Sequence, residues 1–218
     1  LGDVYKRQKY DNSFPSKFNY NFMDISIIEK LKIDPENDLF EILDIIQKWN
    51  RKTDINSQGA GVYGVLYYQL VSNYRNEILE NDNTVSKETL LSALSDIKSY
   101  LTDNFGSINI TLGDFQKLVR GDIEIPIWGL PDVITAMSSR PYKDGRRKVT
   151  QGESYIGLIR FNDKGPTIES IISFGNSDSP DSEHYTDQME LYSKFKTKRM
   201  TFDKQEIYSK AKSIYNPN

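Results

Sequence analysis

Residues 154–174 read SYIGLIRFNDKGPTIESIISF, and this stretch decides the fold class. Two β-rich runs, 154–161 and 167–174, flank the five residues 162–166, which include a glycine and a proline. A glycine-containing connection of this length is typical of a β-hairpin. Apolar side chains occupy most positions of both runs, so we expect both faces of this hairpin to be covered by other layers of the protein.

The region before the hairpin is predicted to be helical over residues 26–103. Asp34 followed by a proline indicates a helix start, and apolar residues then recur at helical spacing as far as residue 50. Ser86 is a predicted N-cap for a later helix, whose apolar face carries leucine or isoleucine every three or four residues. The predicted helices cover residues 26–32, 34–50 and 59–80, with another that Ser86 begins.

After Gly106 the helical pattern ends, and glycine and proline residues separate short segments in which apolar and polar residues alternate. Strands are expected at 108–111 and 123–127, and the basic segment 141–148 is expected to be a solvated surface loop. Helices are expected at 187–196 and near the C-terminus. The domain organisation is therefore helical over 26–103, sheet and loop over 104–183, and helical again over 184–215, which is an α+β class with a sheet packed between layers.

The first eight residues are set apart from the fold. The chain starts with Leu1, and residues 3–8 read DVYKRQ, which resembles one reading frame of a sequencing adapter. We expect residues 1–8 to be an artefact and residues 9–218 to be the C-terminal part of a longer open reading frame. A polar N-terminal tail is the alternative.

Composition excludes several functional classes. The chain has 218 residues, of which 37% are hydrophobic and 12% aromatic, enough for a core. It has no cysteine and one histidine, which excludes disulfide scaffolds, a cysteine nucleophile and multi-histidine metal sites. The net charge of −3 argues against a nucleic-acid partner, and no apolar run is long enough for a membrane span.

Motifs for local catalysis are weak. The Ser-x-x-Lys pattern occurs three times, without the companion motifs of penicillin-binding enzymes, and is interpreted as exposed helix surface. No nucleophile elbow and no glycine-rich phosphate loop is present. The three pairs are Ser95/Lys98, Ser193/Lys196 and Ser209/Lys212.

The single histidine, His184, is the remaining candidate for chemistry. Ser177, His184 and Asp187 contain the residue types of a catalytic triad, but closeness in sequence does not provide the required geometry. We therefore interpret His184 as a structural hydrogen-bonding residue and Asp187 as a helix cap.

A calcium site in the same loop is the other possibility. Asp178, Asp181 and Glu183 supply carboxylates, but they lack the spacing of an EF-hand loop. No catalytic, cofactor-binding or metal-binding residue is assigned in this chain.

Several blocks, taken in order, resemble the C-terminal end of the penicillin amidase family, in the branch of acyl-homoserine-lactone and aculeacin-type acylases. The resemblance covers about residues 40–207, and the most specific block is 182–188, which reads SEHYTDQ. Asn50, Leu112 and Glu183 depart from the pattern of that branch. The matching blocks are Trp49-Asn50, 57–60, Phe105-Gly106, 112–114, Arg120-Gly121, Pro126 with Gly129, 152–155, 174–177 and 182–188.

This resemblance implies an N-terminal-nucleophile hydrolase with a four-layer α-β-β-α sandwich, made as a precursor and cleaved into two chains. In the family, a serine at the start of the large chain attacks an amide carbonyl, and its own α-amino group is the base. No residue of this chain matches the serine or the oxyanion-hole asparagine, so the chain alone is expected to be inactive.

Further expectations also follow from the resemblance. The partners would be the rest of the same precursor and a small N-acyl substrate, the location periplasmic or secreted, and a structural Ca²⁺ would lie elsewhere in the protein. The resemblance also implies a zymogen and a role in antibiotic metabolism or quorum quenching. Two alternatives remain: a self-standing binding module, and a complete small hydrolase that uses Ser177 and His184.

Overall fold

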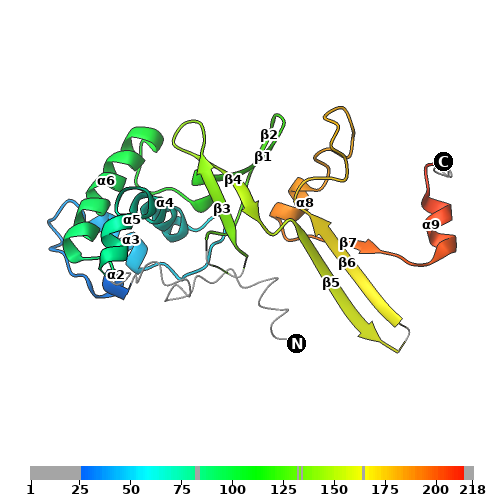
Figure 1. The fold of residues 1–218 in the computed structure, drawn as a ribbon, viewed down its shortest axis with the longest axis horizontal. Coiled ribbons are helices and arrows are strands. Elements are labelled where there is room, and N and C mark those ends of the chain that lie inside the picture. The colour runs from blue at the N-terminus through cyan, green and yellow to red at the C-terminus, as the bar shows by residue number, and fades with distance from the viewer. Residues whose placement is uncertain (1–25, 82–83, 132, 134, 164, 214–218) are drawn as a thin grey trace. The chain divides into compact units, whose positions relative to one another are not determined.

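The computed structural model describes residues 26–81, 84–131, 133, 135–163 and 165–213, and it divides the chain into two compact units (Figure 1). Unit 1 comprises residues 1–153 and unit 2 residues 154–218. Over the described residues, no helix combines the length and the apolar character that crossing a bilayer requires. The elements of unit 1 are α2 (Ser26–Lys30), α3 (Phe40–Gln47), α4 (Gln58–Asn73), α5 (Arg75–Glu80), α6 (Lys87–Phe105), α7 (Leu112–Phe115), β1 (Gln116–Arg120), β2 (Ile123–Pro126), β3 (Met137–Pro141) and β4 (Arg147–Gly152).

Helix α4 is the central helix of unit 1, and it contacts α3, α6 and α7. Its N-cap is Ser57, whose side-chain oxygen accepts a hydrogen bond from the Ala60 N–H at 3.1 Å. Glycines near its start permit close contacts: a Cβ at Gly59 would lie 2.3 Å from the Trp49 side chain, and one at Gly61 would lie 2.6 Å from the Ile110 carbonyl. Glycine costs helix propensity here but allows packing that no larger residue would permit.

Helix α6 confirms the prediction made from Ser86. The Ser86 side chain accepts the Thr89 N–H at 3.1 Å, and Gly106 ends the helix with a positive φ of 69°. The apolar face is fully buried in the core of unit 1, at Leu90, Leu94, Ile97 and Leu101.

A four-stranded sheet, in the order β2-β1-β4-β3, completes unit 1. Strands β1 and β2 pair as an antiparallel hairpin, β1 and β4 are parallel, and β3 and β4 are antiparallel with an irregularity at Ser138/Ser139. The predicted strand at 123–127 is confirmed as β2.

Three helix and strand predictions in unit 1 were wrong. The helix predicted from Asp34 begins instead at Phe40. The Asp34 carboxylate accepts the Glu36 N–H and the Asn37 side-chain oxygen accepts the Leu39 N–H, so residues 34–39 form turns. The helix predicted over 59–80 is divided at Tyr74 into α4 and α5. The segment 108–111 is not a strand, because Thr111 and Asp114 form a capping box that starts α7.

Unit 2 contains the predicted hairpin. Strands β5 (Tyr155–Asn162) and β6 (Gly165–Ile172) pair in antiparallel register, with Leu158 opposite Glu169 and Ile159 opposite Ile168. A third strand, which the sequence analysis missed, pairs with β6 over residues 168–170. The elements are β5 (Tyr155–Asn162), β6 (Gly165–Ile172), α8 (Met189–Ser193), β7 (Lys198–Met200) and α9 (Lys204–Lys210).

The hairpin of unit 2 is not covered on both faces by the described residues of this chain. Figure 1 shows β5 and β6 as a long ribbon, and β7 borders only part of it. Of the β5 side chains, Leu158 is buried, whereas Ile159 is 52% and Phe161 80% exposed. Within this chain the apolar pattern of β5 therefore has no matching cover.

Candidate functional site

The most specific sequence block forms the closed neck of a loop in unit 2, where residues 174–177 run beside residues 184–188. The Ser177 N–H donates to the His184 carbonyl at 3.1 Å, and the Gln188 N–H donates to the Phe174 carbonyl at 2.8 Å. Gly175 fits between them, because a Cβ there would lie 2.0 Å from the His184 carbonyl oxygen. The glycine is therefore needed for the close approach of the two backbones.

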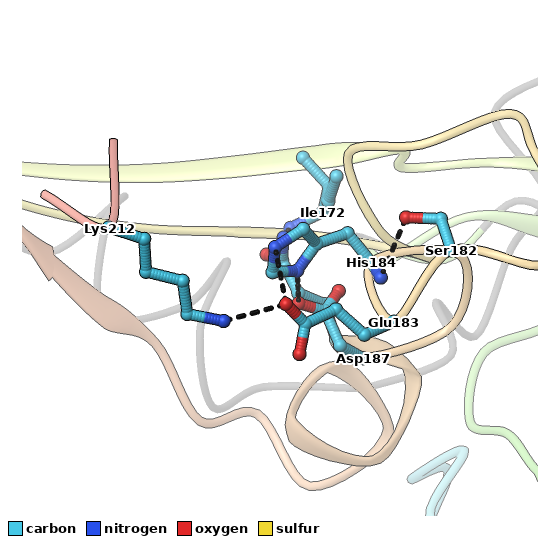
Figure 2. Close-up of polar contacts among 7 residues, drawn as sticks. Ile172, Ser182, Glu183, His184, Asp187 and Lys212 are labelled. Atoms are coloured by element: carbon cyan, nitrogen blue, oxygen red, sulfur yellow. Dashed lines mark hydrogen bonds and ion pairs between the residues drawn. The ribbon is translucent and has the colours of Figure 1, made fainter. Parts of the chain in front are cut away.

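His184 lies in this neck among charged side chains (Figure 2). Its Nδ1 lies 2.9 Å from Asp187 Oδ2, and its Nε2 lies 3.7 Å from Glu183 Oε1. Lys212 Nζ donates to the same Glu183 oxygen at 2.6 Å, and this hydrogen bond is the main cause that lowers the pKa of Glu183. The cluster links the loop to the C-terminal segment through Lys212.

This geometry provides the base-orienting part of a triad but not the nucleophile part. The second ring nitrogen of His184 faces a carboxylate, and the Ser177 hydroxyl oxygen accepts the Ser179 N–H at 3.2 Å. About half of the His184 side chain is exposed, whereas an oxyanion site must exclude water to be effective. In the structure His184 is a hydrogen-bonding residue of the neck, held by Asp187.

Asp187 does not cap the following helix, contrary to the prediction. Helix α8 begins at Met189, its N-cap position is Gln188, and no side chain accepts a hydrogen bond there. The Asp187 carboxylate instead binds His184, and Gln188 Oε1 accepts the Ile172 N–H at 3.4 Å. Hydrogen bonding within the neck therefore takes precedence over capping of this short helix.

The possible calcium ligands are not grouped as a metal site. In the described ranges, no three residues of the histidine, cysteine, aspartate and glutamate types come together in a way that would hold a metal ion.

Of the three Ser-x-x-Lys pairs, only Ser95/Lys98 lies wholly within a helix, α6, because Lys196 and Lys212 follow the ends of α8 and α9. Lys98 binds the Asp38 carboxylate and carbonyl, and the Ser193 and Ser209 hydroxyls donate to backbone carbonyls three residues earlier. These contacts engage Lys98, Ser193 and Ser209 with groups outside their own Ser-x-x-Lys pairs.

A second polar cluster lies in unit 1, and the sequence analysis did not find it. The predicted surface loop 141–148 is a loop only between β3 and β4, and Arg147 at the start of β4 is half-buried. Its guanidinium carbon lies 3.5 Å from the centre of the Tyr68 ring, and Nε donates to Ser139 Oγ at 3.0 Å. The prediction of a solvated loop is wrong for Arg147, because sheet pairing turns this residue towards α4.

Tyrosine hydroxyls complete the Arg147 cluster. The Tyr68 oxygen accepts hydrogen bonds from the Ser139 N–H and hydroxyl, both at 3.0 Å, and the Tyr100 hydroxyl donates to the Gly145 carbonyl at 2.5 Å. Burial lowers the pKa of Arg147 and raises the pKa of Tyr100. The basic residues of segment 141–148 were the only sequence signal of this cluster.

Comparison with known proteins connects the chain to one family. The model of the penicillin amidase family matches residues 13–209. An acyl-homoserine lactone acylase PvdQ from Pseudomonas syringae pv. syringae (strain B728a) is 36% identical over 98 residues, and one from Pseudomonas fluorescens (strain Pf0-1) is 35% identical over 98 residues. Each of these matches covers 44% of this chain and 13% of the relative.

A solved structure is also similar. The thermostable penicillin G acylase from Alcaligenes faecalis matches with a TM-score of 0.48 and 13% sequence identity, over 100% of this chain and 50% of that chain.

Proposed function

Because the chain belongs to the penicillin amidase family, we propose that it is the C-terminal part of an acylase that hydrolyses the amide bond of an N-acyl compound. The family match over residues 13–209 is the observation that carries this proposal. In this proposal the nucleophile is a serine at the start of the large chain, outside these residues, and its α-amino group is the base. The two polar clusters of the chain support this assignment, since neither pairs a nucleophile with a base.

The substrate class is proposed from the relatives. The matched Pseudomonas proteins are named acyl-homoserine lactone acylases, so an N-acyl-homoserine lactone is the first substrate to test. Penicillin G is the second. The attacked group in both is an amide carbonyl, and the acylase releases a carboxylic acid and an amine. We further propose a periplasmic or secreted location and maturation by self-cleavage of a precursor.

The contribution of this chain would be structural. Strands β5 and β6 would join one sheet of a four-layer α-β-β-α sandwich, and the remaining layers of the precursor would cover the exposed side chains of Ile159 and Phe161. The outer edge of β5 has no partner strand among the described residues, since the sheet order is β5-β6-β7. An open strand edge with apolar neighbours is a position where another strand can add.

The test begins with the genomic DNA upstream of the codon for Lys9. We expect an in-frame extension that encodes a Gly-Ser cleavage junction, and the full-length product should release homoserine lactone or 6-aminopenicillanic acid from the two substrates. Replacing the junction serine with alanine should abolish both self-cleavage and hydrolysis, while the 218-residue chain alone should show neither. A stop codon just before Lys9 would contradict the proposal and favour a self-standing binding module.

A further inference from the structure

The side chain of Arg147 in unit 1 is a half-buried cation without an opposite charge beside it. Among the residues that the structure describes, no carboxylate lies within 4.0 Å of its guanidinium, although nine other lysine or arginine side chains do have such partners. Withdrawing a charge from water is unfavourable unless another charge or several hydrogen bonds compensate. Arg147 thus has the surroundings of a cation that pairs with an anionic ligand.

The guanidinium is held in a fixed orientation. It is stacked on the Tyr68 ring, and Ser139 accepts hydrogen bonds from Nε and from Nη2. Ser139 is itself buried and is fixed in turn by its two hydrogen bonds to the Tyr68 oxygen. An arginine whose orientation is fixed in advance loses little side-chain entropy when an anion binds.

Two hydrogen-bond donors of this cluster remain available. The contacts with Ser139 use Nε and Nη2 of Arg147, which leaves Nη1 without an acceptor among the described residues. The Tyr68 oxygen accepts two hydrogen bonds from Ser139, and the Tyr68 O–H donates to no acceptor among the residues that the structure describes. A carboxylate has the two oxygens that would accept from these donors.

We infer that Arg147, with Tyr68, forms a binding site for a carboxylate that is attached to an apolar or aromatic group. A single carboxylate matches the single charge of Arg147. The Tyr68 ring, whose centre lies 3.5 Å from the guanidinium carbon, supplies apolar surface beside it. The carboxylate can belong to a free organic acid or to an acidic side chain of another polypeptide segment. This inference does not depend on the proposed hydrolysis, since it concerns binding by unit 1 alone.

Chemical modification of the unaltered 218-residue chain tests the site. Phenylglyoxal reacts with accessible arginines, and peptide mass spectrometry measures its reaction with Arg147 and with Arg140, an exposed arginine of the neighbouring strand. We expect sodium phenylacetate to slow the modification of Arg147 by about tenfold at saturation, as the loss of a charge-assisted hydrogen bond predicts, and to leave Arg140 unchanged. Sodium chloride at the same ionic strength should protect neither arginine.

The outcomes separate the two sources of the carboxylate and define failure. Protection by phenylacetate alone supports a free acid as ligand, whereas protection also by the blocked peptide N-acetyl-Phe-Glu-amide supports an acidic side chain. The inference is overturned if phenylacetate leaves the Arg147 rate unchanged, if chloride protects equally, or if Arg147 does not react at all, because a ligand must reach the guanidinium. The R147K variant keeps the charge but loses the planar fork, so its stabilisation against thermal unfolding by phenylacetate should be smaller than that of the R140Q control.

Discussion

Units 1 and 2 use similar apolar sequence patterns with different results. In unit 1 the apolar faces of α3, α4 and α6 are buried against one another in one continuous core. In unit 2 few apolar side chains are buried, and large ones are exposed along β5 and near α9, such as Phe161 at 80% and Phe202 at 67%. The difference shows that an apolar pattern indicates which surface of an element tends to be buried. Whether that surface is buried depends on other elements that pack against it, and the described part of unit 2 does not contain enough of them.

The largest expected difference between the units comes from removing one apolar side chain from each. Leu94 is completely buried, so L94A should lower the free energy of unfolding of unit 1 by about 2–5 kcal/mol. Ile159 of unit 2 is half exposed, so I159A should change the free energy of unfolding of unit 1 by less than about 0.5 kcal/mol. Both tryptophans, Trp49 and Trp128, lie in unit 1, so urea denaturation followed by tryptophan fluorescence measures this unit.

Equal losses in L94A and I159A would show that the two units unfold as one and would invalidate the comparison.

The same experiment bears on another expectation drawn from the sequence, that residues 9–218 expressed alone are insoluble or partly unfolded. With a self-contained core in unit 1, we expect the defect to be confined to unit 2. The double variant I159K/F161K should then raise the solubility of the chain and leave the denaturation midpoint of unit 1 unchanged.

The next largest effect is expected at the neck of the loop in unit 2. In G175A the new methyl group would lie 2.0 Å from the His184 carbonyl oxygen, so the backbones must separate. Overpacking of this kind typically costs about 1–3 kcal/mol, which corresponds to hydrogen exchange about ten to a hundred times faster at the amides of Ser177 and Gln188. The matched control is G165A, where no atom lies within 4 Å of the new methyl and only the hairpin turn is strained.

Amide exchange that is unchanged at the neck of G175A would show that its hydrogen bonds are already open in solution. A change in the tryptophan-monitored unfolding of unit 1 in this variant would again contradict the independence of the two units.

A smaller difference is expected between two helix caps. Ser57 caps α4 in the core of unit 1, and Asp203 caps α9, which has no buried residue, with its carboxylate accepting the Glu206 N–H at 2.8 Å. S57A should lower the stability of unit 1 by about 1 kcal/mol in the same denaturation experiment. D203A should leave it unchanged and reduce only the helical circular-dichroism signal. A larger effect of D203A on unit 1 would mean that α9 packs on its core.

The sequence predicted what depends on local interactions. Ser86 marks a helix start because a short hydroxyl side chain satisfies backbone N–H groups within one turn, and Gly165 marks the hairpin turn because its φ of 104° suits glycine. Asp34 was misleading, since the same carboxylate chemistry that caps a helix also forms a turn on its own.

Features that depend on tertiary contacts were not predictable. Arg147 became half-buried through the pairing of β4 with β1 and β3, in which it lies opposite Gln116 and Pro141. The triad residue types around His184 were recognised from the sequence, but only the structure shows that Glu183 occupies the direction in which a serine would have to lie. Conversely, the apolar runs of β5 and β6 predicted cover that is not provided within this chain.

The smallest expected effect concerns acid stability and again separates the units. Glu124 on β2 accepts hydrogen bonds from Lys143 and Tyr142, which are the two largest causes that lower its pKa. Because its pKa is lower in the folded than in the unfolded state, the unfolded chain binds more protons in acid, and the stability due to Glu124 is lost as the pH falls. We therefore expect E124Q to flatten the decline of unit 1 stability between about pH 5 and pH 3.

The matched residue in unit 2 is Glu206, whose pKa is also lowered, chiefly by the hydrogen bond from Lys210. E206Q should leave the pH dependence of the tryptophan-monitored transition unchanged, because the carboxylate belongs to a helix that buries none of its residues. If E124Q and E206Q flatten the curve equally, the effect is one of overall charge and not of the Lys143 and Tyr142 contacts. If neither does, the Glu124 cluster is too screened by solvent to contribute to the stability of unit 1.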